Sequence, residues 1–187
     1  MNNKSINTVI ASQLEIISQG QNYLELISDE EYNYIPSPNF VSSCGSHIRH
    51  IIDHYLAIKV GASTGLIDYD VRSRGEEVES NRLIAIEMLS EIANWINSLS
   101  VEDLNNQISI STEVSISKKE THSFSSSLGR ELIFAASHAI HHYAIITQIS
   151  TQLKTKTPEG FGIAPATSSF LREQKLSGVK KQNILNR

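Results

Sequence analysis

Apolar residues recur at three- and four-residue spacing along four long segments of this chain of 187 residues. That spacing places them on one face of an α-helix. A helix with one apolar face must bury that face, and long helices commonly do so by packing on one another. The sequence therefore predicts an all-α protein built as a four-helix bundle.

Proline, glycine and polar stretches separate the four predicted helices. Pro36 and Pro38 stop the first helix, and Gly61 is expected to end the second. The stretch that follows Gly61 is too long for a tight turn, so we expect a crossover connection rather than simple up-and-down winding. The predicted helices span about 5–27, 42–60, 80–99 and 126–153, and the crossover loop spans about 61–80.

Between the third and fourth helices, helical spacing gives way to alternation of apolar and polar residues. Ile108 and Ile110 alternate in this way, and Val114 and Ile116 repeat the pattern. Alternation is typical of strands and predicts a small β-hairpin at this place. No comparable pattern follows the fourth helix, so 154–187 is expected to be an irregular C-terminal extension with one short helix near 166–175.

Composition and charge argue against several classes of function. The formal net charge of −4 gives no electrostatic case for binding nucleic acid or an anionic membrane surface. No apolar run approaches the ~20 residues of a membrane-spanning helix, and the N-terminus lacks a signal-peptide core. Cys44 is the single cysteine, which excludes an intrachain disulfide. We expect a cytoplasmic protein with neither nucleic acid nor membrane as a partner.

Six of the seven histidines fall in two short windows, 47–54 and 138–142. An α-helix turns by about 100° per residue, so positions on the fourth helix can be compared by angle. With His138 at zero, His142 lies at about 40° and His141 at about 300°. The strip of His141 is polar, so we expect His141 at the surface. His138 and His142 point inward as an i,i+4 pair, the spacing at which two imidazoles can reach one ion.

Helical phase does not distinguish the three histidines of the second helix as clearly. With His50 at zero, His54 lies at about 40° and His47 at about 60°, so all three share one strip beside the apolar face. One or two of them can face the fourth helix, and phase does not choose which. Two inward histidine clusters favour a metal site, because neutral imidazole is the commonest metal-ligand side chain. The competing interpretation is a hydrogen-bonded histidine core without metal.

The stretches GSHIRHIIDHYLAI and SSLGRELIFAASHAIHHYAIIT resemble the DinB-like (DinB/YfiT) superfamily. DYDVRSR after the second helix and FGIAP near the C-terminus also resemble one branch of it, so the resemblance extends over about 39–165. It implies a four-helix bundle with a crossover, in a single DinB-like domain covering 1–187 with its core at about 5–153.

The resemblance also implies a metal site with three histidine ligands. The H-x-x-x-H pair of the family falls on His138 and His142. Its pattern of a histidine, two apolar residues and an aspartate matches the sequence that begins at His50, which becomes the third ligand. The ion is expected to be divalent, zinc or nickel foremost among the metals that suit imidazole. Whether His47 or His54 joins the site stays open.

Some relatives of this kind are thiol S-transferases or isomerases, so the resemblance implies a metal-dependent enzyme, of thiol S-transferase type or, through a metal-bound water, of hydrolase type. Its substrate would be a small molecule, with a low-molecular-weight thiol as one candidate, and a homodimer is the expected assembly. A thiol or a water that reaches the metal is acidified, so the same three ligands suit both reactions. No catalytic residue can be assigned. The alternative is a non-catalytic metal-binding or stress-response module whose site is structural or vestigial.

Four further side chains carry expectations of their own. Glu131 lies on the strip of the inward histidines and could be a ligand, a base or an orienting partner, but a first-turn charge favoured by the helix dipole is the preferred interpretation. Asp53 is expected to face solvent. Cys44 is expected to be buried and structural, and His122 to lie at the surface.

Overall fold

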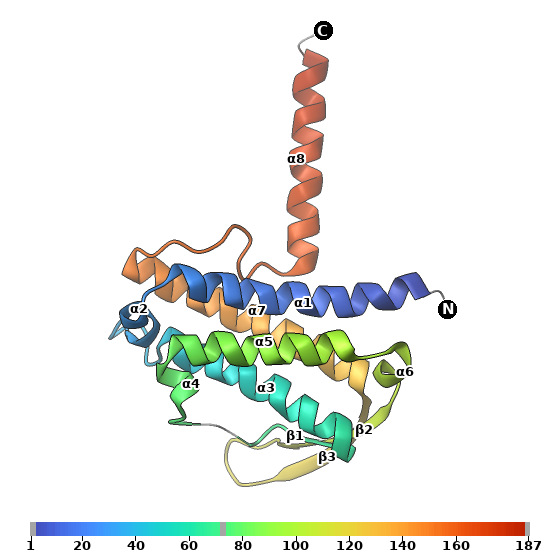
Figure 1. Ribbon diagram of the computed structural model, residues 1–187. Coiled ribbons are helices and arrows are strands. Elements are labelled where there is room, and N and C mark those ends of the chain that lie inside the picture. Colours follow the sequence, from blue (N-terminus) through green and yellow to red (C-terminus); the bar gives the residue numbers. More distant parts are fainter. Residues whose placement is uncertain (1–2, 72–73, 186–187) are drawn as a thin grey trace.

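Four long helices form a bundle in the computed structural model, which describes residues 3–71 and 74–185 (Figure 1). They are α1 (Asn3–Leu26), α3 (Cys44–Thr64), α5 (Arg82–Ser98) and α7 (Leu128–Leu153). α1 packs against α5 and α7, and α3 packs against the same two helices. The consecutive helices α1 and α3 are therefore diagonal partners, and the predicted four-helix bundle with a crossover is confirmed.

Serine caps fix where the two histidine-bearing helices begin. Ser43 precedes α3 and accepts a hydrogen bond from the backbone N–H of Ser46. Ser127 precedes α7 and accepts one from the backbone N–H of Arg130. Such caps satisfy backbone donors that have no partner inside the helix. Both starts agree with the sequence prediction, and α7 ends at Leu153 as predicted.

The second long helix continues past the glycine that was predicted to end it. α3 runs to Thr64, and Gly65, with a φ of 81°, caps it by donating its N–H to the carbonyl of Gly61. Gly61 instead marks a close approach: a Cβ there would lie 2.3 Å from Cγ1 of Ile67. The glycine is needed for packing rather than for helix termination.

A small sheet lies beside the end of α3. Its strands are β1 (Leu66–Asp68), β2 (Gln107–Glu113) and β3 (Thr121–Ser127), in the order β1-β2-β3. β2 and β3 are antiparallel and form the predicted hairpin, whereas β1 pairs in parallel with β2. β1 was predicted as loop because three residues are too few to show alternation. Three short helices complete the bundle: α2 (Asp29–Asn33), α4 (Glu77–Ser80) and α6 (Val101–Leu104).

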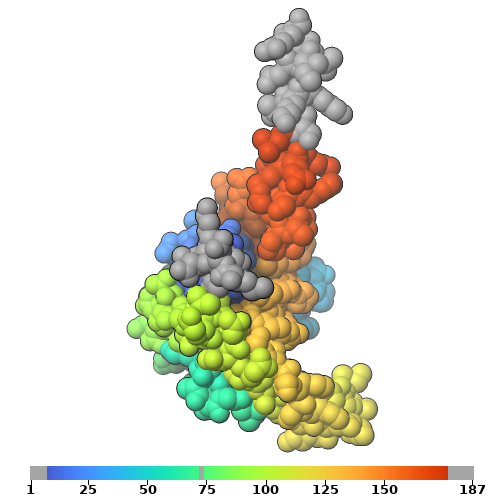
Figure 2. All heavy atoms as spheres, turned by 90° about the vertical axis from the view of Figure 1, so that its right-hand side faces the viewer, coloured from blue at the N-terminus to red at the C-terminus, as the bar shows by residue number. Residues whose placement is uncertain are grey.

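The C-terminal extension is irregular only as far as 164, so the prediction of an irregular segment over 154–187 was largely wrong. α8 (Pro165–Leu185) follows and is longer than the short helix expected there. Figure 1 shows it projecting away from the bundle, and Figure 2 shows the same for the part of α8 that is drawn in colour. Its apolar residues lack the periodicity on which the prediction relied, while Pro165 suits a first helical position. None of the described helices is long and apolar enough to cross a membrane.

The core contains buried polar groups, namely the hydroxyls of four fully buried tyrosines and one thiol. The hydroxyl groups of Tyr32 and Tyr143 donate to backbone carbonyls, and that of Tyr55 donates to the side chain of Gln13. The Tyr23 hydroxyl lies 3.2 Å from Sγ of Cys44. Cys44 is buried, as expected, and burial raises the pKa of its thiol. Cys44 is therefore a structural residue rather than a reactive thiolate.

The close contact at Gly61 predicts that Gly61→Ala destabilises the protein by about 1–3 kcal/mol, because the added methyl group overpacks the Ile67 contact. Helix propensity alone predicts the opposite sign, since alanine stabilises a helix by about 1 kcal/mol relative to glycine. Urea unfolding measures the difference. The neighbouring exposed Ala62→Ser is the control and should change stability by about 0.5 kcal/mol or less.

Candidate metal centre

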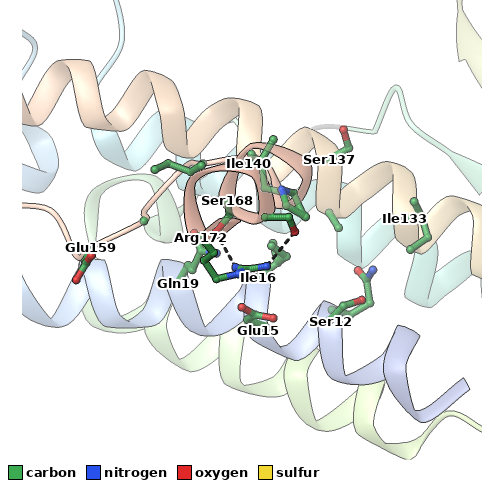
Figure 3. Close-up of a pocket in the computed structure, with 17 residues that line it drawn as sticks. Ser12, Glu15, Ile16, Gln19, Ile133, Ser137, Ile140, Glu159, Ser168 and Arg172 are labelled. Carbon is green, nitrogen blue, oxygen red and sulfur yellow. Dashed lines mark hydrogen bonds between the residues drawn. The ribbon is translucent and has the colours of Figure 1, made fainter. Parts of the chain in front are cut away.

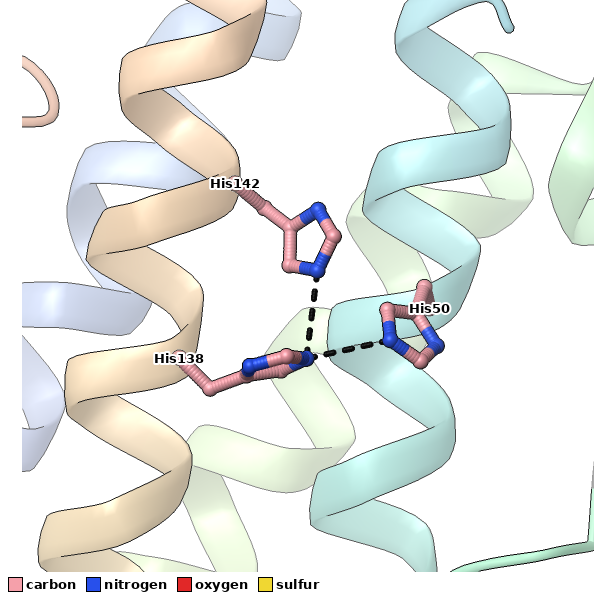
Figure 4. Close-up of side chains that lie close together, drawn as sticks. All are labelled: His50, His138 and His142. Carbon is pink, nitrogen blue, oxygen red and sulfur yellow. Dashed lines mark hydrogen bonds between the residues drawn. The ribbon is translucent and has the colours of Figure 1, made fainter. Parts of the chain in front are cut away.

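Three histidine rings converge between α3 and α7 (Figure 4). The Nε2 atom of His138 lies 3.0 Å from Nε2 of His50 and 3.1 Å from Nε2 of His142. The candidate ligand atoms of all three lie within 4.8 Å of one another. His138 and His142 are one turn apart on α7, and His50 reaches them from α3. The structure thus brings together the three histidines that the family resemblance implies as metal ligands.

Burial keeps one of these rings neutral. His142 is 9% exposed, while His50 and His138 are half-buried. Burial, and then the proximity of His138, His47 and other histidines, lowers the pKa of His142 to about 3. A neutral imidazole keeps one nitrogen lone pair, which is what metal coordination requires.

Hydrogen bonds alone do not satisfy this arrangement. A ring nitrogen carries either one proton or one lone pair, so it can serve one partner well. Nε2 of His138 nevertheless meets two ring nitrogens at hydrogen-bonding distance. A cation at the centre would let three lone pairs point at a common position. The donor set therefore fits a divalent metal such as zinc or nickel better than a hydrogen-bonded histidine core.

The two remaining histidines of α3 border the cluster without entering it. Nδ1 of His47 lies 2.8 Å from Nδ1 of His142, on the side of the ring away from the cluster. Nδ1 of His54 donates to the backbone carbonyl of His50 at 3.0 Å. The ring of His54 lies 4.3 Å from that of His138, measured between centroids. Within the described residues, neither adds a nitrogen to the metal-competent group.

Glu131 is not the ordinary first-turn charge that was preferred from sequence. It is fully buried and accepts hydrogen bonds from the Tyr69 hydroxyl at 2.6 Å, from Nη1 of Arg130 at 2.7 Å and from the Ser126 hydroxyl. Burial alone would raise the pKa of Glu131, but these hydrogen bonds and the charge of Arg130 hold it below its usual range. The carboxylate acts as an anchor for the segment after β1, and it lies outside the three-histidine group.

Asp53 was expected to face solvent and is instead buried. Arg49, one turn earlier on α3, donates to Asp53 at 2.9 Å and also contacts Glu79 at 3.3 Å. The expectation failed because Asp53 is paired with Arg49, which also contacts Glu79 of α4, and helical phase alone cannot show such partners. His141 and His122 are exposed, as expected.

Two aromatic residues beside the cluster were missed from sequence. The ring of Phe134 stacks on His138 with centroids 5.9 Å apart, and the ring of Tyr69 stacks on His54 at 5.2 Å. Phe134 lies one turn before His138, so helical spacing could have found it. Tyr69 reaches the site from the segment after β1, within the DYDVRSR stretch. Arg72 and Ser73 of that stretch lie outside the described residues.

A separate groove of about 590 Å³ lies between α1, α7 and the start of α8 (Figure 3). Ile140 of α7 and Ile16 of α1 are among its apolar lining residues. Arg172 sits at its α8 wall and donates to Ser168 and Ser169. Ile140 lies about 200° around α7 from His138, so this groove opens on the opposite face of the helix from the histidine cluster.

The fold is similar to two solved structures from Bacillus subtilis. YjoA, a DinB-like protein, matches with a TM-score of 0.59 and 15% sequence identity, over 82% of this chain and 98% of that one. YfiT, described as a probable metal-dependent hydrolase with an unusual four-helix bundle topology, matches with a TM-score of 0.55 and 15% identity, over 83% and 91%. The chain therefore has a DinB/YfiT-like fold.

In sequence, the chain is similar to part of FK506-binding protein 5 of Rhizopus delemar. The two are 35% identical over 109 residues, which is 58% of this chain and 28% of that protein. The match thus spans less than a third of the length of this curated relative. No protein-family model matches the chain.

The low pKa of His142 predicts how the metal-free protein responds to acid. An unfolded chain protonates this histidine near pH ~6.5, whereas the folded chain does so only near pH 3. Stability from this group is complete above pH ~6.5 and is lost as the pH falls from there towards 3. Imidazole ¹⁵N NMR should find His142 neutral at pH ~5. Titration of His142 near pH ~6.5 in the folded protein would contradict this.

Proposed function

We propose that this chain binds one divalent metal ion through the Nε2 atoms of His50, His138 and His142, and that it is a metal-dependent hydrolase. The observation that carries the proposal is the convergence of three ring nitrogens, with two separations of 3.0 and 3.1 Å that share one atom. Zinc and nickel are the foremost candidates, because both suit imidazole ligands.

Three protein ligands suit a catalytic site better than a structural one. Structural zinc sites are closed by four protein ligands, whereas catalytic sites use three and leave a position for water or substrate. His50 and His138 are only half-buried, which supports access from solvent to the centre of the cluster. A divalent ion bound there would lower the pKa of a water or thiol that reaches it and would polarise a substrate carbonyl.

The chain's own residues would hold and shield this centre. His142 is neutral and needs to lose no proton before it can act as a ligand. Phe134 covers one face of the His138 ring, and His54 packs on the other histidines under the ring of Tyr69. The hydrogen bond from Tyr69 to Glu131 fixes that aromatic cover to α7. These contacts keep the ligand rings in place and exclude water from part of their surroundings.

Hydrolysis is preferred over thiol S-transfer because the similar YfiT is described as a probable metal-dependent hydrolase. The two reactions would use the same ligands. Cys44 is buried, so the thiol of an S-transfer reaction would have to come from a second small molecule.

Metal analysis of protein purified without a metal-affinity tag tests the binding step. We expect about one divalent ion per chain after zinc or nickel loading and dialysis. His142→Ala should lose the ion, because it removes a ligand at the most buried corner, while His141→Ala is the matched control on the exposed strip and should retain it. A wild-type protein with less than about 0.1 ion per chain would contradict the proposal.

Activity assays test the catalytic step on the loaded protein. Ester, amide and phosphoester substrates should be hydrolysed, and the rate should fall by at least about 100-fold in His142→Ala or after chelation, with His141→Ala close to wild type. Turnover only with a thiol and an electrophile would replace hydrolysis by thiol S-transfer. A metal-loaded protein without either activity would favour the non-catalytic metal-binding module.

A further inference from the structure

We infer that His47, itself held by Ser42, positions the metal-facing ring of His142: Nδ1 of His47 accepts a hydrogen bond from the Nδ1–H of His142, which leaves the Nε2 lone pair directed to the cluster. This inference rests on the proposed metal site. It assigns a role to His47, which helical phase and family resemblance left open. The evidence is a chain of two short contacts that leads away from the cluster.

The first contact joins two imidazoles. Nδ1 of His47 lies 2.8 Å from Nδ1 of His142, and the ring centroids are 5.1 Å apart. The second contact joins Nε2 of His47 to the Oγ atom of Ser42 at 2.9 Å. Ser42 and His47 are both half-buried, and the N-cap Ser43 fixes the start of α3 between them. Both nitrogens of His47 are therefore in use.

The positions of the protons determine which atom donates in each of these two hydrogen bonds. If Nε2 of His142 is a ligand, it has no proton, and the neutral ring must carry its proton on Nδ1. That N–H then donates to Nδ1 of His47, which must be an unprotonated acceptor. His47 in turn carries its proton on Nε2 and donates it to the hydroxyl oxygen of Ser42. One choice at the metal ligand thus fixes both outer groups.

The opposite direction would be incompatible with binding through Nε2 of His142. A proton on Nδ1 of His47 would donate to His142, whose own proton would then sit on Nε2 and face the cluster. A serine hydroxyl can donate or accept, so Ser42 tolerates either direction. The acceptor at His47 is therefore the group that selects the productive tautomer, and His47 is a positioning residue.

Metal affinity separates this role from simple packing. Competition with a chelator should show that His47→Leu weakens binding about 10–100-fold, the usual effect of losing a partner of a ligand histidine. His47→Asn should bind within about threefold of wild type, because its side-chain oxygen can occupy the place of Nδ1. Ser42→Ala should lose about two- to tenfold. His122→Leu, on the exposed hairpin, is the control and should bind as wild type.

The tautomer of His142 gives a readout that packing would not change. Imidazole ¹⁵N NMR of the metal-free, folded proteins should find the proton of His142 on Nδ1 in wild type and His47→Asn, and mainly on Nε2 in His47→Leu. Wild-type affinity in His47→Leu, or a proton on Nε2 of His142 in wild type, would overturn the inference. If wild type binds no metal, the proposed function fails, but the tautomer still tests the role of His47.

Discussion

A ring nitrogen has room for one proton or one lone pair, and this constraint determines what the histidine cluster can hold. Nε2 of His138 meets two other ring nitrogens, at 3.0 and 3.1 Å. Protons alone cannot satisfy both contacts well, whereas one cation can accept all three lone pairs. The same constraint continues outward through His142 and His47 to Ser42, because a lone pair on Nε2 of His142 requires His142 to donate to His47 and His47 to donate to Ser42.

The rest of the fold serves to hold α3 and α7 at the separation that this cluster needs. The buried ion pair of Arg49 and Asp53 extends to Glu79, and so ties α4 to α3. Glu131, buried at the start of α7, accepts a hydrogen bond from Tyr69 and ties the segment after β1 to that helix. A buried carboxylate is stable only when it is hydrogen-bonded or paired with a cation, and Asp53 and Glu131 each meet this condition. The polar groups around the cluster therefore have structural partners, which leaves its chemistry to the histidines.

Helical phase predicted from sequence which histidines of α7 turn inward, because most of that helix is apolar and its polar strip is narrow. It could not separate His50 from its neighbours, because all three histidines of α3 share one strip; the structure gives each a different position. Helical phase also wrongly placed Asp53 towards solvent, and it did not show that Glu131 is fully buried. Asp53 is paired with Arg49, which also contacts Glu79 of α4, and Glu131 is hydrogen-bonded to Tyr69 in the segment after β1, so both depend on elements distant in sequence. The bundle could be predicted from the local sequence pattern, whereas these contacts with segments distant in sequence could not.

X-ray absorption at the metal edge of the zinc- or nickel-loaded protein tests the central claim most directly, because it counts the imidazole ligands of the bound ion. We expect three imidazole nitrogens at about 2.0–2.1 Å from zinc, together with one or more oxygen ligands at the open positions. The same spectrum from His142→Ala should lose this signature. A spectrum with no imidazole shell, or one unchanged in His142→Ala, would contradict the assignment of the cluster as a metal site.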